Sequence, residues 1–241
     1  MLIEIEKFNA SDYSVNENNT YVDPIEASGQ FEGDIVLSKI QQRNAIRNED
    51  LKWPGGVVPY TMPLFFGVQG RIMVALAVSE FSRNTCVRFV TRTNQTDYLA
   101  LFRGGGCYSM VGRMGGKQEL SLATDCDQMG IVIHEFMHAL GFWHEQSRID
   151  RDQYVRIRWE NISPGTENNF QKYSAYIQQT LDEEYDYSSV LHYSGRAFSK
   201  NGRATVEPKQ FMGNFVIGQR LGFSRTDIKK INKLYNCTGY F

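Results

Sequence analysis

The sequence has little of what marks several common classes of protein. Its 241 residues contain 26 basic and 27 acidic side chains, which gives a net charge of −1. Proteins that bind nucleic acid usually carry a clear basic excess. No apolar run is long enough to span a bilayer. We therefore expect neither nucleic acid nor a membrane among the partners of this protein.

A signal peptide is also missing. The start, Met1 to Glu6, alternates apolar and acidic residues and lacks the basic and apolar regions that a signal peptide needs. Because the cysteines point to secretion, we expect such a peptide to have been removed or to lie outside this sequence.

Cysteine is scarce, and none of the four residues forms a C-x-x-C pair or lies near the histidines. They are Cys86, Cys107, Cys126 and Cys237. An even number at long spacings fits two disulfides in an oxidising compartment, with three possible connectivities, whereas four reduced thiols are the alternative. Five N-x-[ST] sequons are compatible with a secreted glycoprotein: Asn9, Asn18, Asn94, Asn161 and Asn236.

Residues 1 to about 43 differ from the rest of the chain. They hold no cysteine or histidine and are rich in Asn, Glu, Asp and Ser, which predicts an extended or partly helical leader with little core of its own. A short helix could start at 36–40. Arg43, in a polar stretch before Asn44, is a plausible processing point.

From Trp53 onward the pattern predicts a mixed α/β domain. Four segments have the composition of strands: 57–61, 86–90, 98–102 and 119–122. Three helices are expected: 71–83, a helix capped by Asp127 that runs through Leu140, and 225–235 with a capping box of Ser224 and Asp227. Residues 145–223 are rich in turns and show little periodicity.

The chemistry is concentrated in one segment. His134 and His138 are four residues apart, so on a helix both rings point to the same side and can bind one metal ion. Gly141 can end that helix in a left-handed conformation and let the chain return His144 to the same metal. Three histidines leave one position open for water, as a catalytic zinc site requires.

Glu135 follows the first ligand and can reach a water on the metal without being a ligand itself. Zinc would lower the pKa of this water, and Glu135 would pass its proton to the leaving amine. H-E-x-x-H alone matches other proteins by chance, but the extension to His144 is far stricter and is the metzincin pattern. This extension argues against a zinc hydrolase that acts on something other than peptides.

The stretch from His134 to Asp150 resembles the astacin family of metzincins, with its Glu after the third His and its later Arg and Asp. The resemblance covers Asn44 to Cys237. It implies an α+β fold of the metzincin type. An N-terminal lobe (about 44–141) would have a mixed twisted sheet and two long helices. A mostly irregular C-terminal lobe (about 142–241) would have a C-terminal helix. The zinc would lie in a cleft between the lobes.

Two further segments resemble the family. Ser189 to Tyr193 is similar to the S-x-M-H-Y turn beneath the zinc, whose Tyr is a further zinc ligand and helps to stabilise the transition state; that role falls on Tyr193. Leu191 replaces the usual Met, and its similar volume preserves an apolar floor. Phe31 to Ile35 is similar to the F-x-G-D motif of astacin propeptides, whose Asp binds the zinc. Asp34 is then the latency residue, whereas an ordinary Gly-Asp turn is the alternative.

The resemblance implies several other roles. Cleavage between Arg43 and Asn44 would separate an inhibitory propeptide (1–43) from the protease domain (44–241), and the new N-terminus would meet Glu145. Arg220 would line the S1′ pocket and favour an acidic residue after the scissile bond; the alternative is a solvated surface charge. The other implied features are substrate binding by strand addition at Leu120 and Ser121, and the disulfides Cys86–Cys237 and Cys107–Cys126.

The sequence therefore predicts a secreted zinc endopeptidase in its zymogen form, with one zinc ion per chain. The expected partners are protein or peptide substrates and an activating protease, and we expect a monomer. A catalytically inactive zinc protein that uses the same fold for binding is the alternative. Such a protein would be expected to lose the general base, and Glu135 is present.

Overall fold

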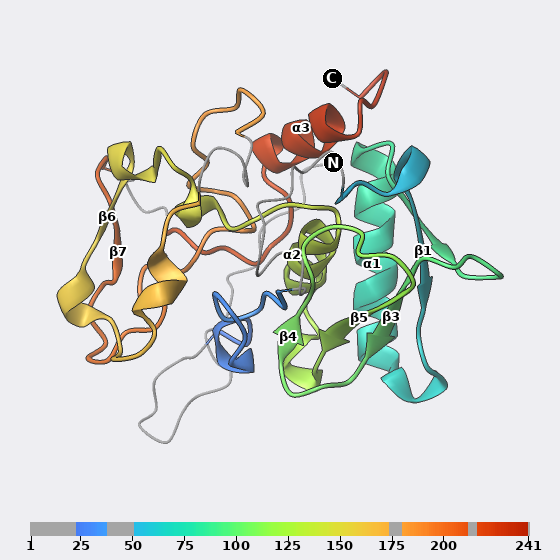
Figure 1. Ribbon diagram of the computed structural model, residues 1–241, viewed down its shortest axis with the longest axis horizontal. Helices are drawn as coiled ribbons and strands as arrows, with labels where there is room; N and C mark the ends of the chain where they lie inside the picture. The colour runs from blue at the N-terminus through green and yellow to red at the C-terminus, as the bar shows by residue number, and fades with distance from the viewer. Residues whose placement is uncertain (1–22, 38–50, 174–179, 212–215, 241) are drawn as a thin grey trace, which may run out of the picture.

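The computed structural model describes residues 23–37, 51–173, 180–211 and 216–240. An N-terminal part contains a sheet and two helices, and a C-terminal part is mostly irregular (Figure 1). The described leader segment 23–37, blue in Figure 1, lies between them. This arrangement confirms the predicted α+β fold with a zinc site between two lobes. The processing point at Arg43 and Asn44 lies outside the described residues, as does most of the helix predicted at 36–40.

The main sheet has the strand order β2-β1-β3-β5-β4. Its strands are β1 (Val57–Thr61), β2 (Arg88–Thr91), β3 (Tyr98–Phe102), β4 (Cys107–Tyr108) and β5 (Lys117–Leu122). Four strands run parallel and β4 is antiparallel to β5. The bounds predicted for β1 and β3 match, whereas β2 starts two residues later and β5 two residues earlier than predicted.

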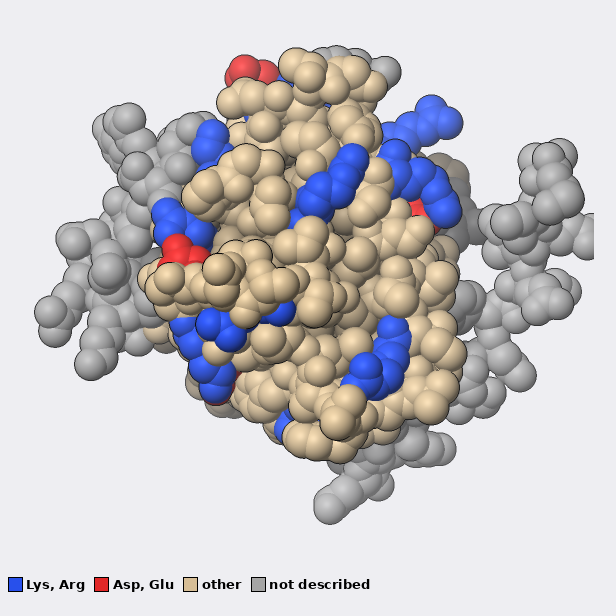
Figure 2. Space-filling model, turned by 90° about the vertical axis from the view of Figure 1, so that its right-hand side faces the viewer, with Lys and Arg blue, Asp and Glu red and all other residues tan. Residues whose placement is uncertain are grey.

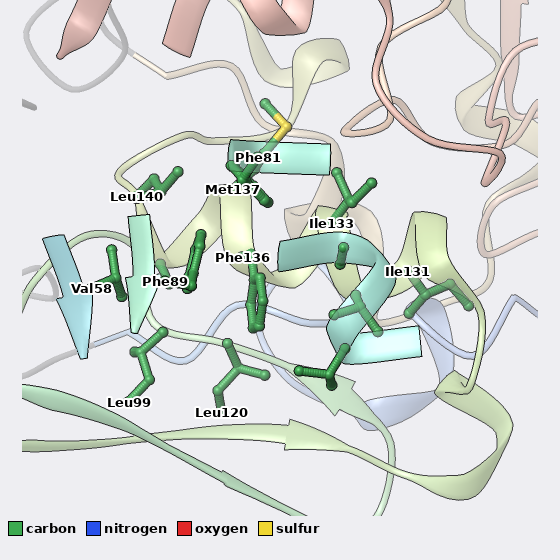
Figure 3. Close-up of a cluster of buried hydrophobic side chains, with 14 of the residues drawn as sticks. Val58, Phe81, Phe89, Leu99, Leu120, Ile131, Ile133, Phe136, Met137 and Leu140 are labelled. Carbon is green, nitrogen blue, oxygen red and sulfur yellow. The ribbon is translucent and has the colours of Figure 1, made fainter. Parts of the chain in front are cut away.

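Helices α1 (Val68–Asn84) and α2 (Met129–Ala139) pack against the sheet. Figure 3 shows the apolar side chains that meet there, with Phe81 from α1, Phe89 from the sheet and Phe136 from α2. The Phe89 and Phe136 rings stack at 4.2 Å. Full burial of such rings contributes about 1.5–3 kcal/mol each, so α2 is held by a dry core beneath its metal-facing side.

The start predicted for α2 is wrong. Gln128 is the N-cap and has no capping side chain, whereas Asp127 pairs with Arg103 at 2.7 and 3.0 Å. Arg103 also donates to the carbonyl oxygens of Leu122 and Ala123. The ion pair therefore ties the start of α2 to the segment that follows β3, 24 positions earlier in the sequence.

The C-terminal part contains the ribbon of β6 (Val155–Ile157) and β7 (Val206–Pro208) and the helix α3 (Arg225–Leu234). The predicted capping box of Ser224 and Asp227 is present. Single turns of 3-10 helix occur at Glu26–Ser28, Pro54–Gly56, Leu64–Phe66, Thr124–Cys126, Glu145–Ser147, Arg151–Gln153, Trp159–Asn161 and Glu167–Phe170. A second, smaller apolar cluster includes Phe170 and Tyr193.

Two disulfides join Cys86 to Cys237 and Cys107 to Cys126, as the resemblance implied. Among the helices in the described ranges, none is long and apolar enough to cross a membrane. Figure 2 shows the face on the right-hand side of Figure 1, where Lys and Arg side chains are scattered over a mostly uncharged surface and Asp and Glu are few. The cluster of chemically active side chains is inside the molecule instead.

Candidate metal centre

Helix α2 brings two histidines to one side, as their spacing predicted. His134 donates its Nδ1–H to the carbonyl oxygen of Val190 (2.7 Å), and His138 donates to that of Phe142 (2.8 Å). A carbonyl oxygen can only accept, so Nδ1 carries the proton in both rings and Nε2 faces the other histidines. These two Nε2 atoms are 3.0 Å apart. Both rings are fully buried.

The third histidine reaches the same point because the helix stops. Gly141 has a φ of +109°, a conformation that favours glycine. The chain then turns, and His144 places its Nε2 3.3 Å from that of His134. Its Nδ1 lies 2.7 Å from the carboxylate of Glu32, a leader residue. The sequence predicted this return of His144 but not its leader partner.

Asp34 completes the cluster from the leader. Its Oδ2 lies 2.7 Å from His134, 3.2 Å from His144 and 3.5 Å from His138. The four ligand atoms all lie within 4.8 Å of one another, and every one of the residues is buried. The structure therefore brings Asp34 together with the three predicted zinc ligands.

The protonation states of these groups favour a cation among them. Burial lowers the pKa of His134 to about 3. Burial opposes ionisation of Asp34, but the neighbouring histidines outweigh it and hold its pKa well below the usual range. A neutral ring thus presents a lone pair to an anionic oxygen at 2.7 Å. Two such acceptors repel each other unless a metal ion lies between them, and nitrogen and carboxylate donors are ligands of zinc.

His144 differs from His134. Burial would lower its pKa, but the carboxylates of Asp34 and Glu32 raise it to about 9. Metal binding at this ring therefore releases a proton. A carboxylate on the far nitrogen also fixes the orientation of a ligating imidazole.

Glu135 is buried beside this cluster. Among the described residues, neither of its carboxylate oxygens has a hydrogen-bond partner. Burial and the nearby charge of Asp34 raise its pKa well above the usual range. An unpartnered buried carboxyl group costs stability, which makes Glu135 a candidate for a role in chemistry.

Tyr193 contacts the cluster through the leader. Its hydroxyl donates to the carbonyl oxygen of Glu32 at 2.6 Å, and its ring lies 4.9 Å from that of His144. The carboxylate of Glu32 also accepts a hydrogen bond from Ser147. Glu32, the second residue of the F-x-G-D motif, therefore contacts two predicted site residues, His144 and Tyr193. The motif alone did not indicate these contacts.

The edge strands of the sheet are β2 and β4, so the prediction of an edge strand at Leu120 and Ser121 is wrong. Both residues lie in β5, between β3 and β4, and both are fully buried. The leader covers the edge that β4 forms. Ser109, next to β4, donates to the carbonyl oxygen of Asp34 (2.9 Å) and accepts from the N–H of Val36 (2.8 Å). This pairing is parallel.

Arg220 is buried, so it is not a solvated surface charge. Its guanidinium donates to the carbonyl oxygens of Val190 and His192, each at 3.1 Å. It also forms an ion pair with Asp23 of the leader at 2.9 Å. Burial and Asp23 raise the pKa of Glu26, which lies nearby, to about 8. The leader thus places two acidic side chains around the predicted specificity residue.

Glu145 is buried and already has partners. It contacts Lys230 of α3 at 2.5 Å, Arg148 at 3.2 Å and the N–H of Asp186 at 2.9 Å. Lys230 was not singled out from the sequence, because nothing local links it to a residue 85 positions away.

An H-E-x-x-H helix packed against a mixed sheet, followed by a glycine turn that returns a third histidine to the cluster, is the arrangement of the metzincin class of zinc protein. The model of the Astacin family of peptidases matches residues 45–236. The chain therefore belongs to the astacin family and takes one zinc ion.

Similar proteins agree with this assignment. Zinc metalloproteinase nas-6 of Caenorhabditis elegans is 47% identical over 219 residues, which are 87% of this chain and 64% of that protein. Human meprin A subunit beta is 45% identical over 86% of this chain and 30% of its own length. The structure of high choriolytic enzyme 1, a hatching enzyme zinc-protease of the medaka Oryzias latipes, is 43% identical. It covers 83% of this chain and 98% of its own, with a TM-score of 0.72.

Proposed function

We propose that this chain is the zymogen of a secreted zinc endopeptidase that hydrolyses peptide bonds in proteins. The observation that carries the proposal is Glu135, a buried carboxylate with no hydrogen-bond partner in the described chain, beside three convergent histidines. Family membership and the two disulfides support it. Residues 1–43 form the propeptide and 44–241 the protease domain.

His134, His138 and His144 would hold the zinc, which when bound would acidify a water and polarise the scissile carbonyl. Glu135 takes a proton from the attacking water and delivers it to the leaving amine. The hydroxyl of Tyr193, once released from Glu32, donates to the developing oxyanion and serves as a further metal ligand in the resting enzyme.

The leader suppresses activity in three ways in this proposal. Asp34 lies among the three histidines, in the position where the substrate carbonyl and water would bind. The carbonyl oxygen of Glu32 accepts a hydrogen bond from the Tyr193 hydroxyl and so keeps it from the substrate. The backbone of Asp34 and Val36 covers the sheet edge at Ser109, where strand addition would bind substrate.

Arg220 selects an acidic residue after the scissile bond. The ion pair with Asp23 at 2.9 Å supports this role, because a carboxylate on a short side chain already lies against the guanidinium. A bidentate guanidinium favours carboxylates over neutral side chains by charge-assisted hydrogen bonds. In the cut enzyme, peptides with Asp or Glu at P1′ should be cleaved faster than their Asn or Gln counterparts; equal rates would sink this assignment.

Activation follows cleavage between Arg43 and Asn44 by another protease. The new ammonium group then meets Glu145, where it competes with Lys230 for the carboxylate. A buried ammonium requires such a partner.

A catalytically inactive binding protein of the same fold is the weaker candidate. It has no use for Glu135, whose unpartnered burial costs stability.

The test compares uncut chain with chain cut after Arg43, on an unfolded protein substrate. We expect activity only after the cut, and its loss with a chelator or in Glu135→Ala. Asp34→Ala should give activity to the uncut chain. Asp23→Ala, which removes the leader's ion pair with Arg220 and a local bond from the N–H of Ile25 but leaves Asp34 in place, is the matched control and should stay far less active. A fully active uncut wild type refutes latency, and activity without metal refutes the zinc mechanism.

A further inference from the structure

Asp227 lies in the first turn of α3 and is buried. Its N–H donates to the hydroxyl of Ser224 (2.8 Å), and its Oδ2 accepts from the N–H of Ser224 (3.0 Å). These two bonds form a capping box, which by itself is a local helix feature.

The same carboxylate reaches outside its helix. Oδ1 accepts from the hydroxyl of Ser189 (2.7 Å), and Oδ2 accepts from the N–H of Val190 (2.9 Å). A capping box needs neither contact. One buried side chain therefore fixes the turn 189–190 to the start of α3, across 37 positions of sequence.

Val190 connects this anchor to two functional side chains. Its carbonyl oxygen accepts from Nδ1 of His134 (2.7 Å) and from the guanidinium of Arg220 (3.1 Å). The bond to Nδ1 sets the tautomer and the ring plane of a metal-ligating histidine. The N–H of the same residue is held by Asp227, so a shift of the turn moves that carbonyl oxygen away from both donors.

We propose that Asp227 is a positioning residue that sets, through the carbonyl group of Val190, the orientation of the zinc ligand His134 and of the Arg220 guanidinium. It contacts neither side chain itself. The zinc half of the proposal rests on the site geometry. The Arg220 half rests on the proposed function, because only the peptidase reaction would report it.

The experiment measures zinc affinity of the full-length chain by chelator competition, together with the visible spectrum of the cobalt-substituted protein. Asp227→Ala leaves the N–H of Val190 unpaired and should weaken zinc binding by about 10- to 100-fold, the usual loss for a residue that orients a ligand. It should also change the cobalt spectrum, which reports the ligand geometry.

Ser224→Ala is the matched control, because it removes the other half of the capping box and leaves the bond from Asp227 to Val190. Zinc affinity should then stay within about threefold of wild type, although loss of the cap costs about 1 kcal/mol of stability. Equal losses in Asp227→Ala and Ser224→Ala would overturn the proposal and leave Asp227 a helix cap only.

Asp227→Asn covers the case in which the alanine variant does not fold. The neutral amide oxygen accepts from Val190 more weakly than the carboxylate does, so the loss of zinc affinity should fall between those of Ser224→Ala and Asp227→Ala. An asparagine variant that binds zinc as well as Ser224→Ala, with an unchanged cobalt spectrum, contradicts the proposal.

The cut enzyme tests the second half. Asp227→Asn should reduce the ratio of kcat/KM between acidic and neutral P1′ peptides, and Ser224→Ala should not. An unchanged ratio contradicts the Arg220 half. If no variant and no wild type cleaves peptides, the proposed function has failed, whereas the zinc measurements still decide the first half.

Discussion

The two parts of the molecule hold their functional side chains by different means. In the N-terminal part, His134, Glu135 and His138 lie on α2, which is buried from Gly130 to Ala139 and packed on the sheet. In the C-terminal part, Tyr193 and Arg220 lie in segments without regular structure and are held by hydrogen bonds to backbone carbonyl oxygens.

The metal ligands of α2 and the side chains Tyr193 and Arg220 are therefore positioned in different ways. Helix periodicity and an apolar core position His134 and His138, which meet the leader at Asp34. The side chains from the C-terminal part also contact the leader: Tyr193 donates to Glu32, and Arg220 pairs with Asp23. The two parts thus differ in how their site residues are held, by a packed helix in one and by single hydrogen bonds and an ion pair in the other.

Glu135→Gln should have the largest effect on activity. The amide keeps the shape of the side chain but cannot accept a proton, so kcat of the cut enzyme should fall by about 10²- to 10⁴-fold. Glu135 is not among the four ligand residues, and zinc content should therefore be unchanged. Metal analysis and kcat are measured on the same sample. A variant that retains kcat within tenfold would remove Glu135 from the mechanism.

Two buried phenylalanines compare the parts directly. Phe81 lies in the larger core, 4.9 Å from Phe89, and Phe170 lies in the smaller one, 5.7 Å from the Tyr193 ring. Replacement of either by alanine should lower the free energy of unfolding by about 3–5 kcal/mol. Below its melting temperature, Phe81→Ala should keep the kcat of the wild type, whereas Phe170→Ala should lower it, because Tyr193 loses a packing partner. Equal kcat values for the two variants would contradict this division.

The free energy of unfolding should depend on pH through the buried carboxyl group of Asp227. Burial raises its pKa from the ordinary 3.8 to about 6 in the folded protein. The folded state then holds a proton that the unfolded chain releases. This contribution to stability is fully present below pH 3.8 and is lost as pH rises through 6.

The loss amounts to about 3 kcal/mol, at about 1.36 kcal/mol for each pKa unit. Urea unfolding at saturating zinc, compared between wild type and Asp227→Asn, isolates it, because the other titrating groups are shared. The stability of wild type relative to the variant should decline from about pH 4 to about pH 7. A constant difference would mean that Asp227 keeps an ordinary pKa in the fold.

The sequence predicted the parts of the site that depend on local spacing. The strands β1 and β3, the capping box of α3 and the convergence of His134, His138 and His144 follow from periodicity and turn chemistry within a few residues. Asp34 was reached through a motif that resembles those of a known family, and the structure brings it to the same cluster.

The rest depends on contacts between distant segments, which no local pattern carries. The sequence predicted Asp127 as a helix cap, whereas in the structure it forms an ion pair with Arg103. The edge strand that the leader covers is β4, which has only two residues and gives no periodic signal. Likewise, the contacts of Asp23 with Arg220 and of Lys230 with Glu145 exist only once the chain has folded.

Gly141→Ala should have the smallest effect, and it tests the junction between the two parts. No atom lies within 4 Å of the position that a Cβ would take, so the cost comes from backbone strain at φ +109°, about 1–3 kcal/mol. Gly115, at φ +83° and remote from the histidines in sequence, is the matched control. Both variants should melt earlier than wild type. Only Gly141→Ala should also bind zinc more weakly in chelator competition, because His144 reaches the cluster through that turn. If both variants kept wild-type zinc affinity, the position of His144 would have to be fixed by its own contacts, with Glu32 and the Tyr193 ring, and the ligand would belong to the C-terminal network rather than to the end of α2.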